Sequence, residues 1–173
     1  MNAPSIDLHR HMADNPGAVF ETVASEYDVK PRAAVEALPA EMRRFAPGET
    51  FVDAMGDIAT WGDVTLIVHT DDGIMEFTGP IPAGQVGHGY FNLMGSTGFH
   101  GHLRHERCAG LAFVERPFMS KLSAVIVFFN RDGGIMFKVF VGRDEKRELK
   151  ADQLAAFRAL ADRLCKAEMD ATV

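Results

Sequence analysis

The sequence has little cysteine and no long apolar segment. Among its 173 residues are two cysteines, Cys108 and Cys165, which form no Cys-x-x-Cys pair. A zinc knuckle and a dithiol redox site are therefore excluded, and we expect both thiols to be reduced and buried. The longest apolar run, residues 124–129, is far shorter than the roughly 18 residues of a membrane span and suits a buried strand. The first residues carry no basic segment followed by an apolar one, so we expect a cytoplasmic protein and no membrane partner.

The sequence also lacks a surplus of positive charge. Its 18 lysines and arginines face 24 aspartates and glutamates, for a net charge of −6. A protein that binds nucleic acid non-specifically needs the opposite balance, so we expect no nucleic acid as a partner. A local basic pocket for a small anionic ligand stays compatible with this charge. The hydrophobic share of 47% is typical of a globular protein, and the length predicts a single domain over residues 1–173.

Helical spacing dominates the first third of the chain. Asn15 and Pro16 predict an N-cap followed by proline at the first helical position. A second helix is expected to begin at Pro31, and apolar residues at helical spacing predict a third over residues 51–58. The N-terminal helical part therefore extends over about residues 5–60.

Near residue 64 the spacing of apolar residues changes from that of a helix to that of a β-strand. Residues 64–69 and 74–78 predict one hairpin, and residues 123–130 and 135–141 predict another. Residues 79–84 contain two prolines and predict a loop. Shorter strands are expected at residues 90–94, 100–104 and 108–115.

The last element is an amphipathic helix, expected over about residues 152–169, whose apolar face packs on the sheet. The element order, with helices first, then six or seven strands over about residues 64–141, then one helix, predicts an α+β fold with an antiparallel sheet.

Five of the seven histidines fall between His69 and His105. The spacing His100-x-His102-x-x-His105 matches the zinc motif of metallo-β-lactamase-like hydrolases, but Arg104 stands where that motif has an aspartate. A cation there opposes a second metal ion, and on a strand His105 points away from the other two. A metallohydrolase is therefore an alternative that the spacing alone supports.

Two short predicted helices joined near residues 27–31 resemble a helix-turn-helix, which keeps a DNA-binding regulator as a further alternative. Residues 1–50, however, carry five basic and eight acidic side chains. We interpret this segment as a packing unit.

Five segments identify a family by their order and spacing. They are Trp61-Gly-Asp-Val-Thr-Leu-Ile-Val-His69, His88-Gly-Tyr-Phe-Asn92, Gly101-His-Leu-Arg104, Glu115-Arg-Pro-Phe-Met119 and Lys138-Val-Phe-Val-Gly-Arg-Asp144. From about residue 19 to residue 164 the chain resembles the HutX/ChuX family of cytosolic heme-utilisation proteins.

The resemblance implies a fold similar to one half of the larger HemS/ChuS-type proteins, and a homodimer that mimics their duplication. It implies an intracellular heme carrier in iron utilisation that passes heme to a degrading partner and catalyses no reaction itself. The alternative that it leaves open is a heme-degrading enzyme of the HemS/ChuS type.

The resemblance also implies site residues. Its histidines fall on His69 and His102 as ligands of the heme iron. Axial ligation varies among relatives, with tyrosine as one variant, so Tyr90 and its neighbour His88 are further candidates. The roles of His100 and His105 stay open.

Heme also needs an apolar surface for the porphyrin and cations for its propionates. The candidate porphyrin contacts are Phe77, Phe91, Met94, Phe99 and Phe137. The candidate propionate partners are Arg104, Arg116, Lys138 and Arg143. His69 ends an apolar strand and His102 lies beside a glycine in a shorter one, so we expect His69 to be the stronger ligand because it projects from a rigid element.

Overall fold

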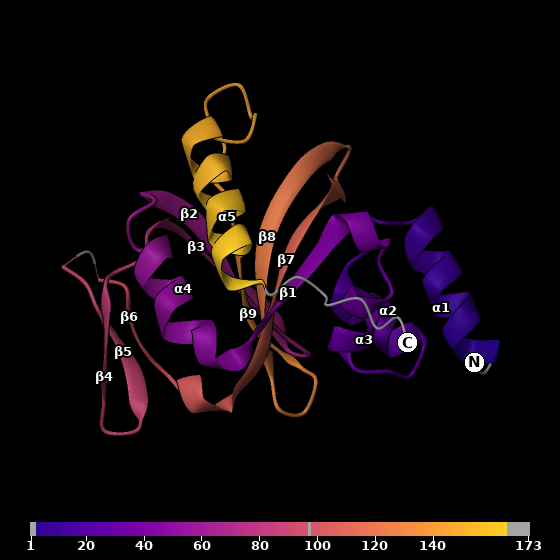
Figure 1. Ribbon diagram of the computed structural model, residues 1–173, viewed down its shortest axis with the longest axis horizontal. Helices are drawn as coiled ribbons and strands as arrows, with labels where there is room; N and C mark the ends of the chain where they lie inside the picture. Colours follow the sequence, from indigo (N-terminus) through magenta and orange to yellow (C-terminus); the bar gives the residue numbers. More distant parts are fainter. Residues whose placement is uncertain (1–2, 97, 166–173) are drawn as a thin grey trace.

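The computed structural model describes residues 3–96 and 98–165 as a curved six-stranded sheet with elements packed on both of its faces (Figure 1). All of its strand pairs are antiparallel. In spatial order the strands are β1 (Arg43–Pro47), β7 (Cys108–Phe118), β8 (Lys121–Asn130), β9 (Ile135–Phe140), β2 (Asp63–Thr70) and β3 (Gly73–Pro80).

A second, three-stranded sheet is formed by β4 (Gly84–Gly87), β5 (Tyr90–Met94) and β6 (His100–Leu103). Its inner face packs against the large sheet through Phe91 and Leu93, each 1% exposed. Because side chains alternate along a strand, Asn92, which lies between these two, faces outward.

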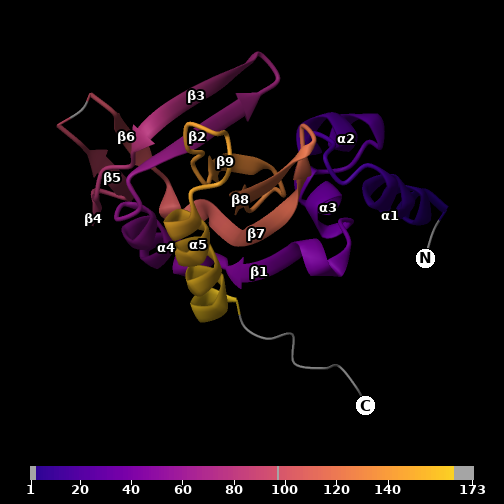
Figure 2. The ribbon, with the colours of Figure 1, turned by 90° about the horizontal axis from the view of Figure 1, so that it is seen from above.

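Five α-helices and three 3₁₀ turns complete the described residues. The helices are α1 (Ala3–Asp14), α2 (Phe20–Glu26), α3 (Pro31–Glu36), α4 (Phe51–Ile58) and α5 (Ala151–Leu164), and the turns are η1 (Ala40–Met42), η2 (Gly48–Thr50) and η3 (His105–Arg107). Seen from above, α1, α2 and α3 lie on one side of the curved sheet, and α4, α5 and the small sheet lie on the other (Figure 2).

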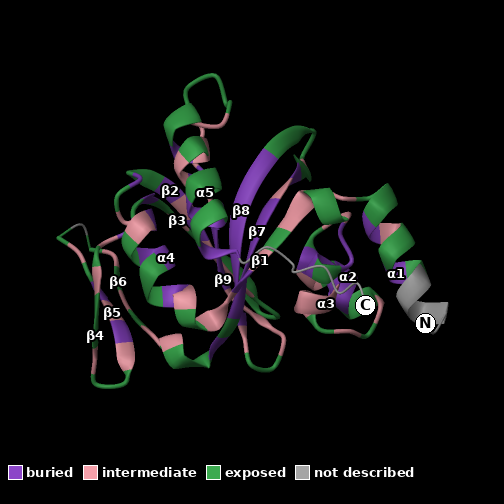
Figure 3. Ribbon diagram, in the orientation of Figure 1, coloured by how far each residue is buried: buried purple, intermediate pink, exposed green. Residues whose placement is uncertain are grey.

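Each face of the large sheet has its own apolar core. Strand β8 is buried along most of its length (Figure 3) because it contributes to both cores. Ile126 and Phe128 belong to the core under α4 and α5, whereas Val127 and Phe129 belong to the core under α1–α3. This burial on both faces explains the unbroken apolar run of residues 124–129. A strand with one face in water needs apolar residues only at alternate positions.

The α+β class and the packing of the C-terminal helix on an antiparallel sheet are confirmed. Phe157 of α5 packs on Phe113 of β7, with ring centroids 5.3 Å apart. The helix is described to Leu164, so the predicted end near residue 169 lies outside the described residues. Both cysteines are free and buried as expected, and burial raises the pKa of each thiol, that of Cys165 to about 11.

The predicted helix start at Asn15 is wrong. The amide of Asn15 donates to the carbonyl of His11, so Asn15 closes α1, and α2 begins only at Phe20. The segment between the helices lies against β7, where a Cβ at Gly17 would come within 2.9 Å of the carbonyl oxygen of Pro117. Tertiary packing therefore sets the helix boundary that the Asn-Pro pair was taken to mark.

The prediction of strands missed β1 and β4. Strand β1 reads Arg-Arg-Phe-Ala-Pro, and two charges and a proline are tolerated because β1 is an edge strand. Strand β4 begins at Gly84, where the sequence predicted a loop, and turns into β5 through His88 and Gly89. Both turn residues have positive φ, which is typical of a two-residue hairpin turn.

Candidate functional site

A cavity of about 740 Å³ lies on the face of the large sheet that carries α1–α3. Its floor is made by alternate residues of β2, including Ile67 and His69, and by Lys138 and Phe140 of the neighbouring β9. Val19 and Phe20, at the start of α2, form one wall, and the turn between β7 and β8 forms another. The volume falls in the range of cavities that bury a small molecule.

The charge of the cavity lining is opposite to that of the whole chain. Five basic side chains line it against a single acidic one, Glu76, in a protein of net charge −6. The five are Arg116, Lys121, Lys138, Arg143 and Arg147. The cavity is therefore suited to an anionic ligand with a large apolar surface.

His69 is held at the edge of this cavity by Glu21 of α2. Its Nδ1 lies 3.5 Å from Oε2 of Glu21, and the other carboxylate oxygen accepts a hydrogen bond of 2.6 Å from Nζ of Lys138. All three side chains are largely buried, with exposed fractions of 20%, 16% and 9% for His69, Glu21 and Lys138. Oε2 of Glu21 is buried and has no hydrogen-bond partner.

Arg116 lines the cavity but is anchored in the protein. It is 4% exposed, donates hydrogen bonds of 2.7 Å to the carbonyls of Pro16 and Ala18, and stacks 3.8 Å over the ring of Phe20. Burial lowers the pKa of Arg116 to about 10, although the charge of Glu21 raises it. Arg116 thus fixes the segment that leads into α2 and so supports one wall of the cavity.

Of the other basic residues, Arg143 and Arg147 lie where the chain leaves β9, and Lys121 begins β8. Arg143 donates to the carbonyl oxygens of Leu122 and Arg147, and Lys121 pairs with Glu148 at 2.7 Å. The guanidinium of Arg147 has no hydrogen-bond or ion-pair partner among the described residues. Sequence reasoning missed Arg147 and Lys121, although both lie next to segments that carried the family resemblance.

The second group of predicted residues lies on the outer face of the small sheet. Oδ1 of Asn92 lies 2.6 Å from Nδ1 of His102, and Arg104 donates to the hydroxyl of Tyr90 at 3.2 Å. The rings of Tyr90 and His102 are in edge contact at 6.0 Å. His102 and Arg104 are exposed, and His88 lies in the turn at the tip of this sheet.

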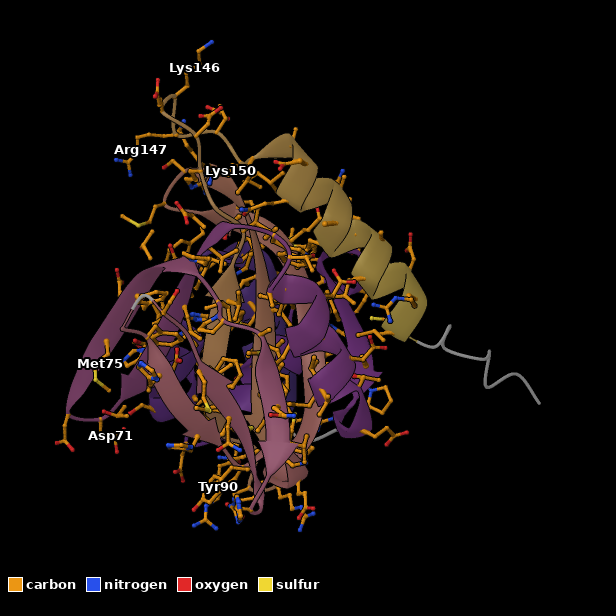
Figure 4. All side chains as sticks on the ribbon, turned by 90° about the vertical axis from the view of Figure 1, so that its left-hand side faces the viewer. Asp71, Met75, Tyr90, Lys146, Arg147 and Lys150 are labelled. Atoms are coloured by element: carbon orange, nitrogen blue, oxygen red, sulfur yellow. The ribbon has the colours of Figure 1, made fainter. Side chains whose placement is uncertain are left out.

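The two groups lie on opposite sides of the large sheet. His69 points to the face that carries α1–α3, whereas His102 points outward from the small sheet, which packs on the other face. In Figure 4, Tyr90 of the second group lies at one end of the molecule and Arg147 of the cavity lies at the other. The structure therefore does not bring His69 and His102 of one chain together.

The aromatic candidates lie outside the cavity. Phe91 and Phe137 are 1% and 2% exposed in the core under α4 and α5, so neither ring lines the cavity. Phe77 and Phe99 stack on each other at 4.1 Å against the same core, and Met94 is exposed on the small sheet. The rings that line the cavity are Phe20, Phe118 and Phe140. Phe140 could have been found from strand alternation with Lys138.

The metallohydrolase pattern is not assembled into a site. His100 and His102 face outward, whereas Nδ1 of His105 is buried near the ring of Phe51. Within residues 3–96 and 98–165, no cluster of three or more His, Cys, Asp or Glu side chains could hold a metal ion. In the same part of the chain, no helix is both long enough and apolar enough to cross a membrane.

Known proteins share both the sequence and the fold. The chain is 40% identical over 147 residues to an intracellular heme transport protein, HutX, of Vibrio cholerae serotype O1, a match that covers 84% of this chain and 74% of the relative. A crystal structure of a protein from Erwinia carotovora is 47% identical, with a TM-score of 0.87 over 91% of this chain and 98% of that one. The heme-binding protein ChuX is 39% identical, with a TM-score of 0.82 over 90% and 97% of the two chains.

The likeness extends in fold alone to a larger protein. The heme degrading enzyme ChuS of Escherichia coli O157:H7 is 15% identical, with a TM-score of 0.73 over 96% of this chain and 49% of that one. This confirms the predicted likeness of the fold to one half of such a protein. The profile of the haem utilisation family ChuX/HutX matches residues 44–160, the span that contributes His69 and all five cations of the cavity, and the chain belongs to this family.

Proposed function

We propose that this protein is an intracellular heme carrier that binds heme in the cavity beside His69 and passes it on. The observation that carries the proposal is the lining of that cavity, in which a histidine and five cations surround apolar strand residues in an acidic protein. Heme combines a flat apolar ring, an iron that takes an imidazole ligand and two anionic propionates, and each part finds a counterpart there. The names of HutX and ChuX, as a heme transport and a heme-binding protein, support the same function.

In this proposal His69 is the iron ligand and the cations bind the propionates. The porphyrin lies on Ile67 and Phe140, and Arg147 at the rim, whose guanidinium has no partner among the described residues, meets the carboxylates. Arg116, Lys138 and Arg143 already have partners, so their charge contributes to the field of the cavity more than to new hydrogen bonds.

We further propose a homodimer in which the group around His102 serves the site of the partner subunit. His69 and His102 of one chain lie on opposite sides of the large sheet, so both can reach one heme only when they come from two copies. Tyr90 and Arg104 would then contribute a phenol and a cation from the second copy. Such an arrangement also covers sheet edges that a single chain leaves open.

The carrier is proposed to work in the cytoplasm and to deliver heme to a heme-degrading enzyme without degrading it. A hemin titration that follows the Soret band tests the binding step. We expect saturable binding at one heme per chain, a lost or shifted band in His69→Ala, and no change in the control His100→Ala, which is exposed on the strand of His102. Binding that His69→Ala leaves unchanged would contradict the assignment.

The same complex tests the absence of catalysis. With ascorbate or a reductase as electron donor, we expect the Soret band to persist. Loss of the band with a defined tetrapyrrole product would instead support the alternative, a heme-degrading enzyme.

Mixing two variants tests the composite site. In a dimer with shared sites, an equimolar mixture of His69→Ala and His102→Ala restores about one intact site in four, because random association makes half of the dimers mixed. Sites that lie within one chain would show no restoration. Sedimentation of the wild type at micromolar concentration as a monomer near 19.0 kDa would rule out the dimer.

A further inference from the structure

Glu21 lies where three elements meet beside the cavity, next to His69 and Lys138 of its floor. It belongs to α2, and its carboxylate contacts His69 at the end of β2 and Lys138 in β9. One oxygen accepts a hydrogen bond from Lys138, whereas the other is buried and lacks a hydrogen-bond partner at its 3.5 Å distance from Nδ1 of His69. A buried carboxylate oxygen without a partner is costly, so its position calls for an explanation.

The carboxylate determines which nitrogen of His69 can bind a metal. An ionised carboxylate only accepts hydrogen bonds, so Nδ1 of His69 must carry the proton when it faces Glu21. Nε2, on the other side of the ring, then keeps its lone pair. Histidines that ligate metals commonly donate their second ring N–H to a carboxylate, which fixes the ring and makes the imidazole a stronger electron donor.

We propose that Glu21 is a positioning residue that fixes the tautomer and orientation of His69 and strengthens it as a ligand of the heme iron. Lys138 holds Glu21 in place and draws part of its negative charge away from the imidazole. The inference rests on the proposed function and deepens it, since it assigns to two residues of α2 and β9 a role in how firmly ferric heme is held.

The proposal predicts effects of opposite sign for two substitutions. Glu21→Gln keeps the shape of the side chain but removes its charge, so His69 becomes a weaker donor. The iron–histidine bond weakens, ferric heme is released about 10-fold faster, and the reduction potential of the heme rises. Lys138→Met leaves the charge of Glu21 to His69 alone, so the potential falls and the iron–histidine bond strengthens.

The test measures the iron–histidine stretching frequency of the ferrous complex by resonance Raman spectroscopy, together with the midpoint potential and the rate of heme transfer to apomyoglobin. The variants are Glu21→Gln, Lys138→Met, His69→Ala and the control Glu26→Gln, which lies exposed on the same helix. We expect a lower frequency for Glu21→Gln, a higher one for Lys138→Met, and wild-type values for Glu26→Gln.

The outcomes separate this inference from the proposed function. If His69→Ala loses the iron–histidine band but both Glu21→Gln and Lys138→Met keep the wild-type frequency and potential, Glu21 does not position His69 and the inference is overturned. If His69→Ala keeps the wild-type band, the proposed function and the inference both fail. If Glu21→Gln does not fold, Lys138→Met decides: a raised frequency supports the inference and an unchanged one overturns it.

Discussion

The group around His69 lies in a cavity between the start of α2 and the large sheet, whereas the group around His102 lies on the exposed face of a three-stranded sheet. The first is held by two cores and by ion pairs between residues that are at most one fifth exposed. The second consists of hydrogen bonds between side chains on neighbouring short strands, several of them exposed.

The family resemblance implied the same role, ligand of the heme iron, for both histidines. Their different surroundings suit them to different roles. A ligand that is already held in place loses little entropy on binding, and partial burial strengthens the interactions of nearby charges. An exposed flat surface offers neither advantage until another molecule covers it. The group around His69 therefore meets the requirements of a heme site by itself, and the group around His102 meets them only at an interface.

The largest expected effect comes from removing the two histidines separately. His69→Ala should release heme roughly 100-fold faster or more. The effect is this large because even the loss of a residue that only holds a metal ligand in place lowers metal affinity roughly 10- to 100-fold. His102→Ala should have a smaller effect, because it removes a contact and not the iron ligand. Transfer of heme to apomyoglobin measures both rates. A larger effect for His102→Ala would reverse the comparison.

A second prediction compares arginines from the two regions in the absence of heme. Arg116→Ala should lower the free energy of unfolding by about 2 kcal/mol, because it removes two buried hydrogen bonds and the stacking on Phe20. Arg104→Ala, which removes a bond on an exposed face, should change it by at most about 0.5 kcal/mol. Thermal unfolding of both variants provides the measurement, and equal melting temperatures would show that Arg116 is no anchor.

A third prediction concerns the rim of the cavity. Arg147→Ala should weaken heme binding about 5-fold, equivalent to about 1 kcal/mol, because its guanidinium is available for a propionate. The effect should shrink at high salt, since the rim is exposed. The matched control is Lys146→Ala, a neighbouring cation that does not line the cavity (Figure 4). Equal weakening by both variants would point to general attraction and not to a specific contact.

The smallest effect is expected at the tip of the small sheet. His88 has φ of 53° and precedes Gly89 in a two-residue turn, a position that asparagine fills better. His88→Asn should raise stability by about 0.5 kcal/mol and leave the heme spectrum unchanged. A changed spectrum would return His88 to the ligand candidates, and the melting curve of the same variant reports the stability.

The sequence predicted those parts of the fold in which a local pattern and the tertiary structure agree. The hairpin of β2 and β3 follows from the strand patterns of residues 64–69 and 74–78, and the buried β8 follows from its apolar run. Strand β1 was missed because an edge strand can carry charges and proline. The start of α2 was missed because contacts of residues 16–18 with β7 decide it.

For the candidate site, the family resemblance and the alternation of residues along strands contributed different predictions. The resemblance identified His69 and His102 as candidates, and strand alternation could place His69 beside Ile67. Neither could find Glu21, because its pairing with His69 depends on how α2 packs across the sheet. The sequence also could not show that Phe91 and Phe137 lie in the core, because aromatic residues occur both in apolar cores and in ligand sites.

The central claim is that the imidazole of His69 binds the heme iron inside the cavity, and chemical rescue tests it most directly. In His69→Gly the cavity should lose the histidine-ligated Soret spectrum, and added imidazole should restore it, because the small ligand occupies the space that the side chain leaves. His102→Gly, treated in the same way, should keep most of the wild-type spectrum without imidazole. A wild-type spectrum of His69→Gly in the absence of imidazole would contradict the claim.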